Sequence, residues 1–116
     1  MGSQSQSTEP DILVVAAEGH IDVQASDGFF DEIEAQTAGG TTKVVLDCSE
    51  LKFISSFALA RLVRLHAKLK AQGGAVKLAA VTGLVLGVFR CTGMQKVLDL
   101  HPTVECARAA FRSEAK

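Results

Sequence analysis

Two adjacent serines, Ser55 and Ser56, directly precede a helical stretch and could carry reversible chemistry. The first backbone N–H groups of a helix lack intrahelical acceptors, so a serine hydroxyl can cap them. A phosphate placed there would also meet hydrogen-bond donors and a favourable dipole. Serine is itself a preferred N-cap residue, and a purely structural role is therefore the simpler interpretation of the local pattern.

Acidic side chains follow two strand-like segments. Asp22 and Asp47 could meet near Ser56 at the carboxyl ends of parallel strands, where open α/β sheets usually bind ligands, with Ser49 as a further polar neighbour. The ordinary alternatives are a hydrogen bond from the loop to Asp47 and a turn at Asp22.

Several patterns that indicate enzymes are missing from the sequence. It has no phosphate-binding loop with lysine, no glycine-spaced dinucleotide fingerprint and no nucleophile elbow. No base or metal ligand accompanies the Asp22, Asp47 and Ser56 set. We therefore expect no enzymatic activity, and an enzyme built on these three residues is the least favoured alternative.

The elements on either side of the serines have clear patterns. Val44 to Leu46 is a branched apolar run, typical of an inner strand covered on both faces. A helix is expected over residues 57–71, ended by Gly73-Gly74. Its apolar stripe consists of Leu59, Leu62, Val63, His66 and Leu69, and its basic face of Arg61, Arg64 and Lys68. Phe57 and the basic face are candidate partner contacts, although a solvated helix face would also explain the charges.

The rest of the chain alternates between strand and helix. We expect strands at Ile12 to Ala17, continuing as an extended segment through Ile21 and Val23, at Val76 to Val81, and at an edge formed by Val97, Leu98 and Leu100. Helices are expected from near Ser26 to Gly39-Gly40, from Gly83 to about Cys91 after a Thr82 cap, and from Val104 to Arg112 after a Thr103 cap.

This order predicts an α/β fold with a mostly parallel central sheet of four to five strands packed against about four helices, because parallel neighbours need long crossovers. One domain over residues 10–112 is expected. Residues 1–9 would form a flexible tail or a weak edge strand, and residues 113–116 a second tail.

Composition narrows the class of protein. The 116 residues suit one small domain, and 12 basic against 13 acidic residues give a net charge of -1. This balance provides no general attraction to nucleic acid or to anionic membranes. No apolar run is long enough to span a bilayer, and residues 1–10 lack signal-peptide architecture. A cytoplasmic location is the simplest expectation.

Cysteines and histidines are scattered. Cys48, Cys91 and Cys106 lack the close paired spacing of structural zinc, so we expect reduced, mostly buried thiols. His20, His66 and His101 are equally far apart, and His66, beside the apolar stripe, is expected to pack and to form a hydrogen bond. We expect no metal and no cofactor.

Five short motifs occur in the order found in stand-alone STAS domains of the anti-sigma-factor antagonist type. They are Glu18-Gly19-His20-Ile21-Asp22, Val45-Leu46-Asp47-Cys48-Ser49, Phe53-Ile54-Ser55-Ser56-Phe57-Ala58-Leu59, Gly73-Gly74 and Thr92-Gly93-Met94. Residues 10–112 thus resemble this family. Each motif is weak alone, but five in order over nearly the whole chain make the resemblance fairly specific.

The resemblance implies a phosphoacceptor. Family members read aspartate, serine, serine or threonine, glycine and an aliphatic residue at this junction, and a partner kinase phosphorylates the first hydroxyl residue. Ser56 matches that acceptor, with Ser55 as a cap or a substitute acceptor. The sequence differs at Ser55 in place of aspartate, at Phe57 in place of the second hydroxyl residue and at Ala58 in place of glycine.

The implied function is partner switching. In the family, the unphosphorylated antagonist binds a serine kinase that also holds a sigma factor or another effector. Phosphorylation breaks that complex and a phosphatase restores it. The altered loop keeps a second hypothesis open, namely an unphosphorylated STAS adaptor subunit of a sensory or lipid-transport assembly.

Overall fold

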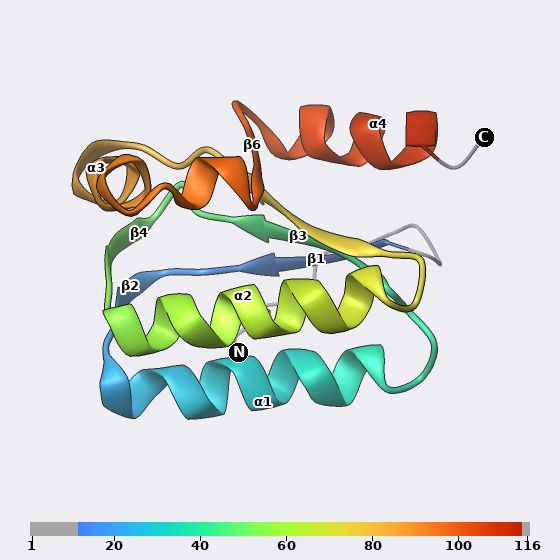
Figure 1. The fold of residues 1–116 in the computed structure, drawn as a ribbon, viewed down its shortest axis with the longest axis horizontal. Coiled ribbons are helices and arrows are strands. Elements are labelled where there is room, and N and C mark those ends of the chain that lie inside the picture. The colour runs from blue at the N-terminus through green and yellow to red at the C-terminus, as the bar shows by residue number, and fades with distance from the viewer. Residues whose placement is uncertain (1–11, 115–116) are drawn as a thin grey trace.

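A computed structural model describes residues 12–114 and contains a four-stranded sheet whose strands all run parallel. The sheet order is β1 (Ile12–Ala16), β3 (Lys43–Asp47), β5 (Ala75–Ala79) and β6 (Asp99–His101). Figure 1 shows its helices: α1 (Val23–Thr37), α2 (Ser56–Lys70), α3 (Gly83–Thr92) and α4 (Val104–Glu114). The predicted α/β class is confirmed. The predictions for residues 1–9 and for residues 115–116 of the second tail lie outside the described part, whereas residues 113–114 belong to α4 rather than to that tail.

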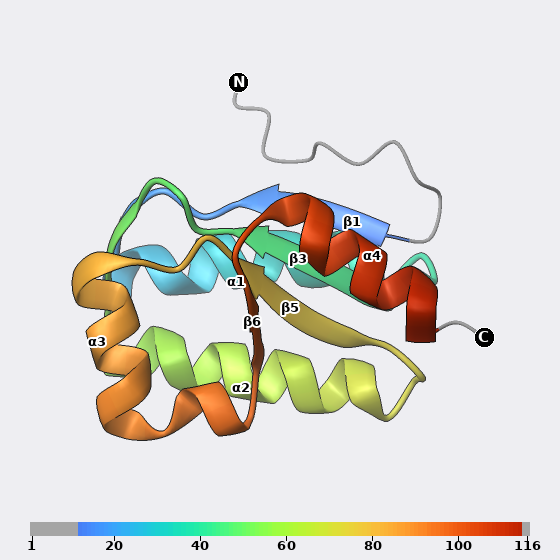
Figure 2. The ribbon, with the colours of Figure 1, turned by 90° about the horizontal axis from the view of Figure 1, so that it is seen from above.

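Helices cover both faces of this sheet. Helices α1 and α2 lie side by side on one face, α4 lies on the other, and α3 stands at one end (Figures 1 and 2). The alternating side chains of the strands divide the core accordingly. The larger cluster lies on the α1 and α2 side, and the smaller one joins Val14 and Val45 to Ala107 and Phe111 of α4.

The predicted inner strand is confirmed, because Val44 and Val45 are fully buried between the two layers. Leu59, Leu62 and Leu69 are buried under α2 as expected, whereas Val63 is only half-buried. Leu65, which the predicted stripe left out, is also buried. The buried face of α2 is therefore centred slightly differently from the prediction.

A second, two-stranded parallel sheet was not predicted. It pairs β2 (Gly19–Ile21) with β4 (Leu51–Ile54), and no strand was expected at β4. Only Leu51 and Ile54 of β4 are buried, so its sequence lacks the alternation that identifies a strand. This small sheet carries the chain from the central sheet to the starts of α1 and α2 (Figure 1).

The expected boundary of the first helix was wrong. Val23 is its first residue rather than the end of an extended segment, and the Asp22 carboxylate accepts the backbone N–H of Ala25 at 2.9 Å. This N-cap starts the helix three residues earlier than Ser26. Ser26 is instead fully buried, and its hydroxyl donates to the carbonyl oxygen of Val23.

Features of the later elements also differ from the prediction. The last strand is Asp99–His101, and Val97 follows the short 3-10 helix η1 (Met94–Lys96) with its side chain exposed. Thr82 precedes α3 without a side-chain capping hydrogen bond, contrary to expectation. The Thr103 cap of α4 is confirmed, because its hydroxyl accepts the N–H of Cys106 at 3.0 Å.

Candidate functional site

Ser55 builds the start of α2. Its extended backbone (φ -79°, ψ 162°) places it at the N-cap, where its hydroxyl accepts the N–H of Ala58 at 3.0 Å. Its own N–H donates to the carbonyl oxygen of Ile21 at 2.9 Å, which ties the helix start to the end of β2. Serine and aspartate are both good N-caps, so a serine can cap the helix at the position where the resembled sequence pattern has aspartate.

Ser56 is the first residue of α2 and is exposed. Within residues 12–114 its hydroxyl makes no hydrogen bond, and the backbone N–H groups of Ser56 and Phe57 have no acceptor. These are the orphan donors of a helix start. An anion attached to Ser56 would therefore lie beside unsatisfied donors at the positive end of a fifteen-residue helix.

The other two departures from the family pattern fit the structure. Ala58 is fully buried in helical backbone, so its Cβ packs in the core. Phe57 instead leaves 42% of its surface exposed beside Ser56.

Three more large apolar side chains are exposed on elements around this helix start. They are Val23 (57%) at the start of α1, Phe53 (36%) in β4 and Leu84 (67%) at the start of α3. Figures 1 and 2 place the starts of α1, α2 and α3 and strand β4 at the same end of the molecule. No sequence pattern singles out these three residues, because their exposure depends on how β4 and the helix starts are arranged.

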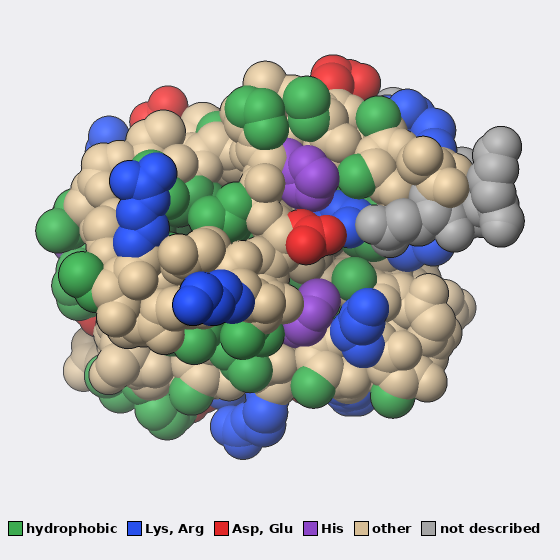
Figure 3. Space-filling model, turned by 45° about the horizontal axis from the view of Figure 1, so that its top comes forward, with side chains coloured by type: hydrophobic (Ala, Val, Ile, Leu, Met, Phe, Trp, Pro, Cys, Tyr) green, Lys and Arg blue, Asp and Glu red, His purple; other side chains and the backbone are tan. Residues whose placement is uncertain are grey.

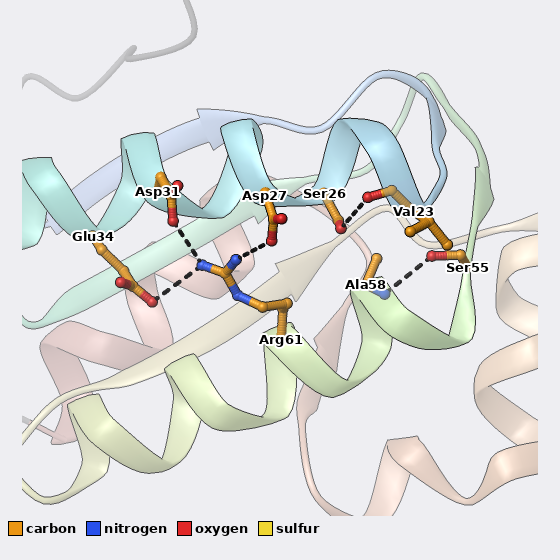
Figure 4. A network of polar contacts seen from close by, with 8 residues as sticks. All are labelled: Val23, Ser26, Asp27, Asp31, Glu34, Ser55, Ala58 and Arg61. Carbon is orange, nitrogen blue, oxygen red and sulfur yellow. Dashed lines mark hydrogen bonds and ion pairs between the residues drawn. The ribbon is translucent and has the colours of Figure 1, made fainter.

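Arg61 is not part of an open basic face. Its guanidinium contacts three carboxylates of α1, at 2.6 Å from Asp27, 3.1 Å from Asp31 and 3.5 Å from Glu34, as Figure 4 shows. Its side chain is only 13% exposed and also lies over the Phe30 ring, 5.6 Å from the centroid. The hydrogen bond to Asp31, followed by that to Asp27, raises the pKa of Arg61. Arg61 thus joins α1 to α2.

The predicted partner contacts nevertheless share one surface hollow. Phe57, Arg61, Arg64 and Lys68 line a depression of about 430 Å³ together with Asp27 and Glu34 of α1. Arg64 and Lys68 are exposed and have no ion-pair partner among the described residues. The cations available to another molecule are therefore Arg64 and Lys68.

The predicted polar neighbours are separated. Asp22 caps α1 and follows Ile21, whose carbonyl binds Ser55, so it lies near the start of α2. Asp47 ends β3, and its carboxylate accepts the N–H of Ser49 at 3.1 Å. The length of β4, about 10 Å at ~3.3 Å per residue, separates this loop from Ser56. The expected meeting of Asp22, Asp47 and Ser56 is not formed.

The three thiols are free, but only Cys48 is buried, so the expectation of mostly buried thiols was wrong for Cys91 and Cys106. Burial and then the charge of Asp47 raise the pKa of Cys48 to about 12. In the part of the chain that the structure describes, no three histidine, cysteine or acidic side chains gather as a metal site.

His66 packs as expected. Its Nδ1 accepts the backbone N–H of Val76 at 3.1 Å, which links α2 to β5. No helix within the described range is both long and apolar enough to cross a membrane.

A family model and a related protein each match most of the chain. The family model described as STAS domain matches residues 5–107. The chain is 31% identical over 103 residues to BtrV of Bordetella bronchiseptica, a protein provisionally assigned as an anti-sigma factor antagonist, with 88% of each chain covered.

Solved structures share the fold. A provisionally assigned anti-sigma factor antagonist of Thermotoga maritima has a TM-score of 0.85 at 19% identity, covering 91% of this chain and 92% of its own. The anti-sigma factor antagonist SpoIIAA of Bacillus, in its unphosphorylated form, has a TM-score of 0.81 at 21% identity, covering 95% and 96%. Its phosphorylated form has a TM-score of 0.72 at 19% identity, covering 93% and 97%.

Proposed function

The chain belongs to the STAS domain family, and on this basis we propose that it acts as an anti-sigma factor antagonist controlled by phosphorylation of Ser56. Its partner would be a serine kinase of the anti-sigma-factor type, and a phosphatase would restore binding. The protein would act in the cytoplasm by binding, without catalytic turnover or a cofactor.

One observation carries the proposal: Ser56 is exposed, makes no hydrogen bond within the described residues, and starts a helix beside exposed apolar side chains. Exposed apolar residues that lie together at one end of a molecule are typical of a protein-binding surface. A phosphate adds about -1.5 to -2 charge and would have to be desolvated if a partner covered this surface.

Geometry favours Ser56 over Ser55 as the acceptor. The Ser55 hydroxyl is half-buried and already accepts the Ala58 N–H, so a kinase would have to break the N-cap to reach it. The Ser56 hydroxyl is exposed and has no such bond within residues 12–114. Phosphorylation of Ser56 could therefore leave the start of α2 in place.

The partner surface would extend from Ser56 along α2. Phe57 would provide an apolar contact, and Arg64 and Lys68 would face acidic groups of the partner. Arg61 would act indirectly, by holding α1 beside α2. Asp22 would contribute through the cap of α1, whereas Asp47 and Ser49 would shape the loop before β4.

A phosphorylation experiment tests the acceptor. The protein is incubated with ATP and a serine kinase of this type encoded in the same genome, and phosphate is located by mass spectrometry. We expect incorporation at Ser56 that Ser56→Ala abolishes. Ser55→Asp is the matched variant, because it removes the other hydroxyl while keeping an N-cap acceptor, and it should still be phosphorylated.

A binding experiment tests the switch. Ser56→Asp should weaken binding to that kinase by about tenfold or more, because it places a charge in the interface. Ser56→Asn, of similar shape but neutral, should bind almost as the unsubstituted protein does. Phosphate on neither serine, with equal binding of the two variants, would contradict the switch and support the unphosphorylated adaptor of a sensory or lipid-transport assembly.

A further inference from the structure

A second surface hollow lies at the other end of α2 and plays no part in the proposed function. Its volume is about 410 Å³, and its lining includes His66 and Lys70 of α2, Lys77 of β5 and Asp99 of β6. Figure 3 shows the face on which histidine side chains lie on either side of a carboxylate, with lysine or arginine side chains around them. The turn at Gly73 and Gly74 closes one side.

This hollow exists because β6 is shorter than β5. The pairing begins at Lys77 and Asp99, so Ala75 and Val76 extend beyond β6 along the edge of the sheet. There the Nδ1 atom of His66 accepts a hydrogen bond from the backbone N–H of Val76. Since Nδ1 is the acceptor, the proton of the neutral ring is on Nε2, which has no acceptor among the described residues.

Lys77 supplies a fixed positive charge. Its side chain is 2% exposed, and its ammonium lies 2.6 Å from the carboxylate of Asp99 and 4.8 Å from the centroid of the Phe111 ring. The Asp99 side chain remains 62% exposed, which leaves its carboxylate able to accept further hydrogen bonds.

Lys70 adds a cation without an ion-pair partner in the described part of the chain. It lies one helical turn beyond His66, and side chains four residues apart share a helix face. The Lys70 ammonium is therefore the cation in the hollow that remains available to a negatively charged group.

We propose that this hollow binds a small organic oxyanion, a metabolite bearing a phosphate or a carboxylate group. The anionic group accepts hydrogen bonds from the Lys70 ammonium and from Nε2–H of His66, and Asp99 accepts from a hydroxyl or ammonium group of the same ligand. The volume is in the range of small-molecule sites and leaves little room for a folded segment of another protein.

The wall of the hollow is fixed by backbone packing. A Cβ atom at Gly74 would lie 1.8 Å from the carbonyl oxygen of Thr42, so only glycine fits this turn. The turn therefore holds the end of α2, including Lys70, in one place against β5.

The surroundings of His66 agree with this ligand charge. Burial, followed by the charge of Lys70, lowers the pKa of His66. Lys77 acts in the same direction, whereas Asp99 and the Val76 hydrogen bond act against it. A bound anion would oppose the two lysines, so the pKa of His66 should rise when the site is filled.

Titration by NMR tests the site with two probes, inorganic phosphate and acetate, each at constant ionic strength set with sodium chloride. We expect saturable shifts of the Ala75 and Val76 amides and of the His66 ring, with a rise in the pKa of His66. Saturation by phosphate alone assigns a phosphate-bearing ligand, and saturation by acetate also assigns a carboxylate.

Two lysine variants distinguish binding at a specific site from general electrostatic attraction of the anion to the protein. Lys70→Ala should weaken phosphate binding about tenfold, because a charge-assisted hydrogen bond is lost. Lys68→Ala removes the same charge from the same helix but lines the other hollow, and its effect should stay below about twofold. Shifts that do not saturate with either probe, or equal effects of the two variants, would overturn the proposal.

Discussion

The two ends of α2 differ in how their polar groups are satisfied. At its start, Ser56 and Phe57 have N–H groups without acceptors in the described structure, and large apolar side chains are exposed nearby. At its end, the His66 ring accepts a hydrogen bond from the backbone N–H of Val76, and Gly74 packs directly on the backbone of Thr42.

This difference predicts which substitutions reduce the stability of the fold and which leave it nearly unchanged. Side chains already engaged in packing or hydrogen bonds contribute to the free energy of unfolding, so changes near the end of α2 should destabilise the fold. Exposed side chains at the start contribute little to folding and remain available to a partner. Ser55 is the exception at the start, because its hydroxyl caps the helix.

The largest expected effect concerns Gly74. Gly74→Ala would press a Cβ against the Thr42 carbonyl, and we expect a loss of more than about 3 kcal/mol in the free energy of unfolding, measured by urea denaturation. Gly39→Ala is the matched control, since its Cβ would meet nothing closer than 4.0 Å, and it should change stability by less than about 1 kcal/mol. Similar stability of both variants would show that the turn can move.

The next largest effect is a difference in stability between substitutions of two arginines in α2. Arg61→Ala should cost about 1–2 kcal/mol, because it removes packing on Phe30 and three ion pairs whose carboxylates are partly solvated. Arg64→Ala should stay within about 0.5 kcal/mol. Urea denaturation at low and high salt measures both, and part of the Arg61 effect should disappear at high salt.

Arg61→Lys sharpens this comparison, because a single ammonium cannot reproduce a guanidinium that contacts several carboxylates. It should recover only part of the lost stability. If Arg64→Ala were as unstable as Arg61→Ala, the distinction between Arg61, which joins α1 to α2, and Arg64, which remains available to a partner, would be refuted.

The N-cap of α2 gives a smaller effect. Ser55→Ala should cost about 1 kcal/mol of unfolding free energy, whereas Ser55→Asp keeps a capping oxygen and should be nearly neutral. Ser56→Ala should change stability by less than about 0.5 kcal/mol, because the described structure gives its hydroxyl no partner. Thermal unfolding of the three variants checks the order, and a loss at Ser56 equal to that at Ser55 would contradict it.

The smallest effect is the pH dependence set by His66. Its pKa in the folded state is lowered from 6.5, so the unfolded chain binds the proton more readily. The stability that the neutral ring contributes is therefore present above pH 6.5 and decreases as the pH falls through 6.5 toward the folded pKa.

NMR titration of the His66 ring measures this directly. The pKa should lie below 6.5 and should move up in Lys70→Ala, because the charge of Lys70 contributes to the lowering. A ring that titrates at or above 6.5 would show that burial and the lysines do not act as described.

The sequence by itself determined the scaffold. The apolar run at Val44 to Leu46 predicted the inner strand, and the spacing of Leu59, Leu62 and Leu69 predicted the buried face of α2. Ser55 and Thr103 were also recognised as caps. These features are local, since periodicity and capping depend on residues only a few positions apart.

Only the tertiary structure decided which side chains are engaged. Arg61 and Arg64 look alike in sequence, but the carboxylates that bind Arg61 come from α1, 27–34 residues earlier in the chain. Strand β4 depends on pairing with β2, and its length sets Asp47 apart from Ser56. The exposure of Phe57 and the hollow beside His66 arise in the same way, because contacts between distant segments depend on how whole elements pack, which no local pattern encodes.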